Sequence, residues 1–290
     1  MPVATTISSP DLTVTLSDLG AELQSITTAT GDELLWHGDT AFWGGRAPIL
    51  FPIVGRGPDD RIAVNGQEAP MRQHGFARHA TFERAEVSPD SCSYVLRDSA
   101  DSRAAYPCAF RLTLHYRLSG PTLSVSAEVT NTGDSLLPFG LGFHPAFAWP
   151  LPGAGDARHQ IRLANGAEPA LAHLQDGYLM PERAPSPFAG GILPLHHGLF
   201  DRDALIFPDG AGEALIYSAP GSTAPALHFA FHNTPNLGIW TKPDAPFLCI
   251  EPWHGMAARA GAGPEIADRP GSLLLNPQAT ATFGYSLRVV

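Results

Sequence analysis

The distribution of glycine and proline constrains the fold of this chain more than any other feature of its sequence. The 290 residues include 29 Gly and 28 Pro, about one residue in five, against roughly 12% in an average protein. They are spread along the chain and are not gathered into tracts. Because Pro breaks the interior of a helix and Gly weakens it, few windows can hold a helix of three turns. The sequence therefore predicts an all-β protein with many turns.

The clearest strand pattern covers residues 110–118 and 122–130. Apolar and polar side chains alternate along both runs, and Ser119-Gly120-Pro121 separates them. We therefore expect a long antiparallel hairpin with one apolar face and one polar or second-layer face. Further short strands are expected at residues 12–16, 93–97, 204–207, 214–217, 226–231, 237–240, 247–251, 272–275 and 280–289.

About a dozen strands at this spacing require sheets that pack face to face. We predict one large antiparallel β-sandwich domain over residues 1–290, with little helix. No change of composition, Ser-rich linker, charge run or internal repeat divides the chain. No G-x-G-x-x-G follows a predicted strand, so a dinucleotide-binding half is not supported.

The charge of the chain restricts its partners and its chemistry. With a formal net charge of −10, the chain should repel a phosphate backbone, so we expect no nucleic-acid partner. Lys242 is the only lysine, and it lies in a predicted exposed turn at residues 241–244. This placement argues against a phosphate loop or a Schiff base, both of which need a positioned lysine.

The location of the protein is predicted from its cysteines and its apolar segments. The three cysteines are odd in number and form no C-x-x-C, which is typical of reduced thiols in the cytoplasm. The first residues lack the basic start and apolar core of a signal peptide. The most apolar stretch, residues 136–151, contains three prolines and a histidine, so we expect no membrane span.

A histidine follows two glycines in the segment at residues 139–145. If this segment is extended, as Pro145 favours, Gly140, Gly142 and His144 share one face. Glycine in a strand often marks the close approach of a ligand, so we interpret this face as a pocket floor with an imidazole at its end. The alternative is a core histidine whose glycines serve a bulge.

A glutamate ends the apolar run at residues 247–250. Both faces of this run are apolar, which is typical of a strand buried on both sides, and we expect the strand to end at Glu251. A carboxylate there, next to Trp253, is costly unless it is hydrogen-bonded or ion-paired. Partial desolvation would raise its pKa toward the range of general bases. The alternative is a structural ion pair with one of the arginines.

Arginines and histidines cluster at residues 44–56 and 73–79, where glycines and prolines indicate tight loops at the rim of a sheet. Arginine donors suit sugar hydroxyls and phosphate oxygens equally, although each arginine taken singly also fits a solvated surface. The chain contains no H-x-H, H-E-x-x-H or G-x-S-x-G. We therefore predict neither a catalytic metal nor a serine nucleophile.

Taken in order, these segments resemble the aldose 1-epimerase (galactose mutarotase) family, and within it the LacX-type branch. Five ordered motifs carry the resemblance, which spans the chain from about residue 10 to the end: A-P-I-L-F-P-I-V-G-R at 47–56, H-G-F-A-R at 74–78, G-F-H-P-A-F at 142–147, D-A-L-I-F at 203–207 and C-I-E-P-W-x-G at 249–255. The resemblance implies the galactose mutarotase-like supersandwich and a small sugar as the partner. It implies no cofactor, and we expect a monomer or a homodimer.

Residue by residue, the resemblance implies that His144 is the general acid and Glu251 the general base of sugar ring opening. It further implies that Arg56, His74 and Asp203 hold the ring oxygen and the hydroxyls. Without the resemblance, Asp203 would be assigned to a solvated turn.

The substrate stays open at this point between a free and a phosphorylated aldose. The H-G-F-A-R motif is shared with enzymes similar to hexose-6-phosphate 1-epimerases, so Arg78, with Arg46, is a candidate clamp for a sugar phosphate. The charge of −10 disfavours a dianion and so favours free aldoses. A non-catalytic carbohydrate-binding module on the same sandwich and a metal-dependent β-barrel enzyme are the competing hypotheses, since a fold alone does not fix a function.

Overall fold

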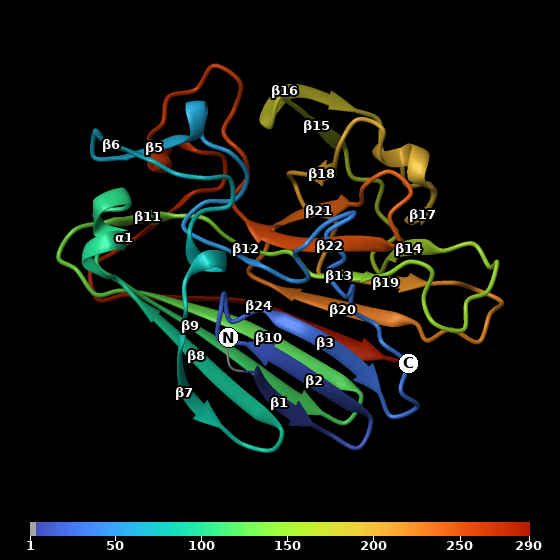
Figure 1. Cartoon of the computed structure of the whole chain (residues 1–290). Helices are drawn as coiled ribbons and strands as arrows, with labels where there is room; N and C mark the ends of the chain where they lie inside the picture. Colours follow the sequence, from blue (N-terminus) through green and yellow to red (C-terminus); the bar gives the residue numbers. More distant parts are fainter. Residues whose placement is uncertain (1–3) are drawn as a thin grey trace.

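The computed structural model describes residues 4–290, and two large antiparallel sheets dominate it (Figure 1). The larger sheet has nine strands in the order β17-β14-β19-β20-β24-β10-β9-β8-β7. Their bounds are β7 (Glu83–Val87), β8 (Ser91–Arg97), β9 (Phe110–Ser119), β10 (Thr122–Asn131), β14 (Gln160–Leu163), β17 (Ile192–Pro194), β19 (Ala214–Ser218), β20 (Leu227–His232) and β24 (Thr280–Val289).

The second sheet has eight strands, with the path β16-β15-β18-β21-β22-β12-β4 and with β13 also paired to β22. Their bounds are β4 (Ile49–Leu50), β12 (Leu141–Phe143), β13 (Ala146–Ala148), β15 (Leu171–Gln175), β16 (Tyr178–Ala184), β18 (Leu205–Phe207), β21 (Asn236–Trp240) and β22 (Phe247–His254). This sheet carries the functional site described below.

Smaller elements complete the described chain. They are β1 (Ala4–Ser8), β2 (Leu12–Ser17) and β3 (Leu23–Thr28) in one sheet, the pair β5 (Arg61–Val64) and β6 (Gln67–Pro70), the pair β11 (Leu137–Phe139) and β23 (Leu273–Leu275), one α-helix, α1 (Ala100–Ala105), and the 3-10 turns η1 (Pro58–Asp60), η2 (Ala77–His79), η3 (His197–Phe200) and η4 (Ile266–Asp268). Within residues 4–290, no helix is both long and apolar enough to cross a membrane.

The core lies between the two large sheets, where aromatic rings of one sheet meet those of the other. Phe143 of β12 contacts Tyr285 of β24, with ring centroids 5.3 Å apart, and Phe147 of β13 contacts Phe229 of β20 at 5.2 Å. Such edge-on pairs join two sheets through buried side chains, as in other sandwiches. The predicted all-β sandwich is therefore confirmed.

The predicted hairpin is also confirmed. β9 and β10 pair from Phe110↔Asn131 to Ser119↔Thr122, and buried side chains alternate with more exposed ones along β9. The alternation arises because successive residues of a strand point to opposite faces.

The predicted end of one strand was wrong. β22 continues past Glu251 to His254. Pro252 is tolerated because it lies at the gap between the two partners on one side of β22: β13 pairs up to Cys249, and β12 pairs from Trp253 onward. At such a gap the missing N–H of proline removes no ladder bond on that side.

The prediction that Gly142 forms an open pocket floor was also wrong, because the Trp253 indole occupies the space beside this glycine. A Cβ atom on Gly142 would lie 2.6 Å from Trp253 Cδ1, and one on Gly238 would lie 2.4 Å from Trp253 Cη2. These glycines are on β12 and β21, the strands on either side of β22. Together they make room for the indole to lie across the sheet, where it forms part of the cavity wall.

We expect Gly238→Ala to lower the free energy of unfolding by about 1–3 kcal/mol, because the new methyl group overpacks the Trp253 seat. Urea unfolding measures this change. Gly263→Ala is the matched control, since a Cβ there meets no atom within 4 Å. Equal midpoints for Gly238→Ala and the wild type would contradict this packing account.

Candidate functional site

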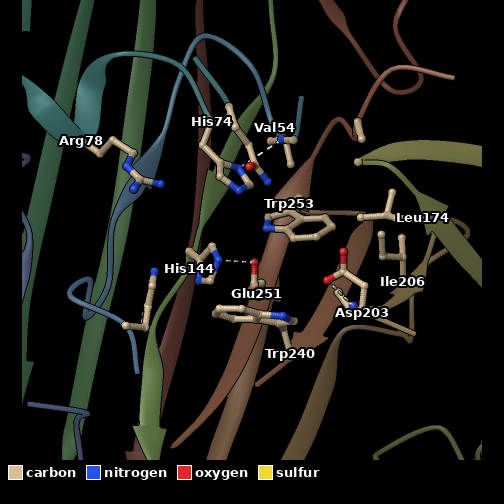
Figure 2. A pocket seen from close by; sticks show the side chains of 16 residues that line it. Val54, His74, Arg78, His144, Leu174, Asp203, Ile206, Trp240, Glu251 and Trp253 are labelled. Carbon is tan, nitrogen blue, oxygen red and sulfur yellow. Dashed lines mark hydrogen bonds and ion pairs between the residues drawn. The ribbon is translucent and has the colours of Figure 1, made fainter. Parts of the chain in front are cut away.

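A cavity of about 340 Å³ opens on the face of the eight-stranded sheet, over β18, β21 and β22 (Figure 2). Side chains of these strands and of several loops line it: Trp43, Val54, Gly55, Gln73, His74, Arg78, His144, Leu174, Gly177, Asp203, Ala204, Ile206, Trp240, Glu251, Trp253 and Ala257. A volume at the lower end of the range for ligand pockets, with few polar groups among apolar ones, suits one small ligand.

A histidine and a glutamate face each other in this cavity. His144 follows β12, Glu251 lies within β22, and the His144 Nε2 atom is 3.2 Å from the Glu251 Oε2 atom (Figure 2). Their side chains are only 8% and 2% exposed. The fold thus brings together the two residues proposed from the sequence as acid and base.

Burial shifts the pKa of both members of the pair toward the neutral form. It raises the pKa of Glu251 well above its usual value, and the charge of Asp203 raises it further. Burial likewise lowers the pKa of His144 to about 3, and the charge of Arg78 adds to this effect. Two charges cannot be hydrated here, so we infer that the pair shares one proton, on Oε2 or on Nε2, and carries no net charge.

His74 is a fixed hydrogen-bond donor in the cavity. It adopts a positive φ of 69°, and its Nδ1 atom accepts a hydrogen bond of 3.1 Å from the N–H of Gly55. Burial lowers the pKa of His74 well below its usual value, and the nearby positive charges of His144, Arg78 and Arg269 act in the same direction. The ring is therefore neutral with its proton on Nε2, which is free to donate.

Asp203 lies in an exposed turn and still lines the cavity, across from His144 (Figure 2). It has a positive φ of 77°, and its Oδ1 atom accepts a hydrogen bond of 2.8 Å from the N–H of Ala204. The backbone bond fixes the carboxylate near the pair, which explains its effect on the pKa of Glu251. Sequence patterns alone assigned this residue to a solvated turn, and the turn is real, but it faces the cavity.

Arg78 brings a cation to the cavity from η2, on the far side of His144 from Glu251 (Figure 2). Burial lowers the pKa of Arg78, and Glu22 opposes this change. Glu22 itself accepts hydrogen bonds from the backbone N–H groups of Arg46 and Ala47. Within residues 4–290, the Arg78 guanidinium forms no ion pair or hydrogen bond, so its donors are available to a ligand.

The structure does not bring Arg56 into the cavity. Its guanidinium pairs with Asp60, with Nε–Oδ1 and Nη2–Oδ2 distances of 2.7 and 2.9 Å, at the edge of a neighbouring groove. A carboxylate four residues away captures this side chain, so the expected contact with a sugar is not formed here. Arg46 is also directed elsewhere, since its Nη1 atom donates to the carbonyl of Gln24 at 2.6 Å.

Three site residues were missed by the sequence patterns. Trp43 and Trp240 line the cavity, and Arg269 is buried behind it. Arg269 donates to the carbonyls of Val54, Arg56 and Met256 and so fixes the loop that carries Gly55. Trp43 directly precedes Gly44-Gly45, and an aromatic residue beside paired glycines at a sheet rim was the available signal.

Comparisons with known proteins identify a family and several relatives for this chain. The family model described as aldose 1-epimerase matches residues 4–174. Protein LacX (plasmid) of Lactococcus lactis subsp. lactis is 30% identical over 297 residues, covering 96% of this chain and 97% of that protein.

Solved structures agree with these sequence matches. A galactose mutarotase related enzyme from Lactobacillus acidophilus is 30% identical, with a TM-score of 0.94 and coverage of 99% of this chain and 97% of that chain. A galactose mutarotase-like protein from Lactobacillus casei is 27% identical, with a TM-score of 0.90 and coverage of 99% and 100%. The chain therefore has the fold of galactose mutarotase-like proteins.

We expect the His144 ring to show no titration between pH 5 and pH 8 in NMR spectra, because the pair gains a second proton only in acid. Arg78→Gln removes a positive charge that lowers the pKa of His144, so uptake of the second proton should move to higher pH. His144→Asn assigns the resonance. A wild-type ring that titrates near pH 6.5, or an unchanged titration in Arg78→Gln, would refute the shared-proton account.

Proposed function

Since the chain belongs to the aldose 1-epimerase family, we propose that it interconverts the α and β anomers of a free aldose by general acid–base catalysis. The observation that carries this proposal is the buried His144–Glu251 pair, 3.2 Å apart in the cavity wall. Anomer exchange requires only proton transfers, which these two side chains supply without a cofactor.

The shared proton defines both directions of the reaction. With the proton on His144, Glu251 takes the proton of the C1 hydroxyl while His144 protonates the ring oxygen. The bond from C1 to the ring oxygen breaks, its electron pair stays on that oxygen, and the O–H electrons form the C1 carbonyl. Rotation about C1–C2 then presents the other face of the aldehyde, and ring closure returns both protons.

This scheme explains why a desolvated pair is useful. Ring opening converts a charged acid and base into a neutral imidazole and a protonated carboxyl group, and closure does the reverse. The cavity keeps the same net charge throughout, so no step leaves an uncompensated charge in a buried site. The raised pKa of Glu251 also makes it a stronger base toward the C1 hydroxyl.

The remaining polar groups are assigned to binding. The free Nε2–H of His74 and the guanidinium of Arg78 donate to sugar oxygens, and the Asp203 carboxylate accepts from hydroxyls. The Trp240 and Trp253 rings present flat apolar faces to the C–H groups of the sugar. Arg56 is left out of this assignment because its guanidinium is paired with Asp60.

Polarimetry or NMR of freshly dissolved α-glucose and α-galactose tests the proposal. We expect the wild type to accelerate mutarotation, and His144→Asn and Glu251→Gln each to lower kcat by about 10²–10⁴-fold. Arg61→Gln, an exposed variant that only removes a surface pair with Glu68, is the control and should behave as the wild type.

Two results would count against the proposal. No acceleration over buffer for any aldose would exclude the activity. Sugar affinity without any effect on the rate would instead identify a non-catalytic carbohydrate-binding protein.

A second candidate, epimerisation of a hexose 6-phosphate, is supported by the unpaired guanidinium of Arg78. Arg78 lies on the side of His144 away from Glu251 (Figure 2). C5 is bonded to the ring oxygen on the side opposite C1, so in the proposed orientation, with C1 at Glu251 and the ring oxygen at His144, the substituent on C5 is directed toward Arg78. However, one cation compensates a dianion poorly in a cavity that also holds the carboxyl groups of Glu251 and Asp203, and the chain carries a net charge of −10. We therefore place the free aldose first.

We expect kcat/KM to be at least as high for glucose as for glucose 6-phosphate, with Arg78→Gln affecting both substrates to a similar degree. The opposite result would be a higher kcat/KM for glucose 6-phosphate than for glucose, with Arg78→Gln lowering the value for glucose 6-phosphate by about 10–100-fold. That is the loss expected for a hydrogen bond between charged groups. That result would make the phosphorylated sugar the substrate.

A further inference from the structure

We propose that Trp43 is a positioning residue that holds the His144 imidazole toward Glu251, and that Lys242 fastens the segment that carries Trp43. This inference rests on the proposed function, because it concerns the same proton-sharing pair. It assigns a role to two residues that the mechanism above does not use: a tryptophan in a rim loop and the only lysine of the chain.

The His144 ring lacks a hydrogen bond that would fix it throughout the reaction. Its Nδ1 atom is buried and has no hydrogen-bond partner among residues 4–290. Its Nε2 atom contacts Glu251, which gains and loses a proton in each direction of the proposed reaction. A catalytic histidine is usually oriented by a partner on its second nitrogen. The orientation of the His144 ring must therefore be fixed by the packing of neighbouring side chains.

Three rings surround the imidazole, and Trp43 alone among them covers its face. The Trp43 and His144 rings are stacked, with centroids 4.9 Å apart and planes at 29°. Trp240 and His74 approach edge-on instead, at 5.8 Å and 87° and at 5.7 Å and 86°. A stacked indole prevents rotation of the imidazole out of its plane, and it stabilises the protonated ring through a cation–π interaction.

The position of the Trp43 ring is closely determined by its surroundings. A Cβ atom on Gly45 would lie 2.6 Å from the ring, so only glycine admits the indole at this place. On its other sides Trp43 contacts Phe247 and Trp240, with centroids 5.7 Å apart in each case. The backbone is held as well, because Trp36 Nε1 donates to the Trp43 carbonyl at 2.9 Å.

Lys242 connects this segment to the strands that carry the rest of the site. Its Nζ atom donates to the carbonyl of Phe42 at 2.6 Å, across 200 positions of sequence. Lys242 lies in the exposed turn between β21 and β22, the strands that carry Trp240 and Glu251. The Lys242 amine thus connects the segment of Trp43 to β21 and to β22, the strand that carries the proposed base Glu251.

The effect on pH dependence has a definite sign. The ionisable groups near His144 are Glu251 and Cys249 of β22, Arg78 of η2 and His74 of the preceding loop, and a substitution of Trp43 alters none of them. Without the indole face the imidazolium is less stable, so the pair loses its remaining proton more easily. The alkaline limit of kcat should therefore move to lower pH.

The test compares Trp43→Leu and Trp43→Phe with Phe42→Leu as the matched control. Phe42 neighbours Trp43 in the same segment, but its ring contacts Trp36. Mutarotation of α-glucose is followed by polarimetry from pH 5 to pH 9. For Trp43→Leu we expect kcat to fall about 10–100-fold, KM to change less than about 3-fold, and the alkaline limit to move down by about half a pH unit.

Trp43→Phe keeps an aromatic face and should recover kcat to within about 3-fold of the wild type, while Phe42→Leu should leave the pH profile unchanged. A Trp43→Leu enzyme with wild-type kcat, or one impaired only in KM, would overturn the positioning role. A wild type that does not accelerate mutarotation would instead refute the proposed function. In that case NMR still tests the stack itself. A stacked indole shifts the resonances of the His144 ring protons upfield, and this shift should be lost in Trp43→Leu.

The Lys242 link is tested separately by Lys242→Met and Lys242→Arg. We expect Lys242→Met to lower kcat about 2–5-fold in the direction of Trp43→Leu and Lys242→Arg to retain activity, since arginine keeps a donor for the Phe42 carbonyl. Acetic anhydride should reproduce the Lys242→Met effect in the wild type and have no effect on Lys242→Arg. Unchanged kcat in both Lys242→Met and the acetylated wild type would overturn the link.

Discussion

A carboxyl group and an imidazole 3.2 Å apart, both removed from water, form the interaction on which the rest of this site depends. In water each group would titrate alone. Here burial raises the pKa of Glu251 and lowers that of His144, so a gain or loss of a proton by the pair leaves a net charge that nothing hydrates. The pair is therefore stable with one proton, and moving that proton between the two side chains is the only inexpensive change. Anomer exchange needs that same change.

The fold places this pair by joining distant parts of the chain on one sheet. β22 pairs with β21 along one side and with β12 and β13 along the other, and His144 stands where β12 ends and β13 has not begun. Glycines on the flanking strands admit Trp253, and an arginine behind the site fixes the loop of Gly55, which in turn fixes the tautomer of His74. The His74 ring is thus held by a backbone contact, while the His144 imidazole, the proposed general acid, is held by aromatic packing.

The predictions from sequence succeeded where a local pattern decides the outcome. Glycine and proline content predicted an all-β chain, and side-chain alternation predicted the β9–β10 hairpin. His144 and Glu251 were singled out because each is a polar residue beside apolar strand residues, and the structure places both in one cavity, while their catalytic roles stay predictions. Family motifs added Asp203, which no local pattern distinguishes from a solvated turn.

The predictions failed where the outcome depends on which of several similar residues forms a contact, or on a contact between residues distant in sequence. Arg56 and Arg78 have the same chemistry, and only the structure shows that Asp60 captures one while the other faces the cavity. Gly142 signalled open space, but a tryptophan more than a hundred residues later fills it. Trp43 and Lys242 belong to no motif, because the roles proposed for them rest on contacts between residues far apart in the sequence, Trp43 with His144 and Lys242 with Phe42.

The central claim is that His144 and Glu251 act as one unit, and a double-mutant cycle tests it most directly. The rate of mutarotation is measured for the wild type, His144→Asn, Glu251→Gln and the double variant. If the two residues exchange a single proton, the double variant loses no more activity than the more damaging single variant. Losses that multiply in the double variant would show that the two side chains act independently and would contradict the account.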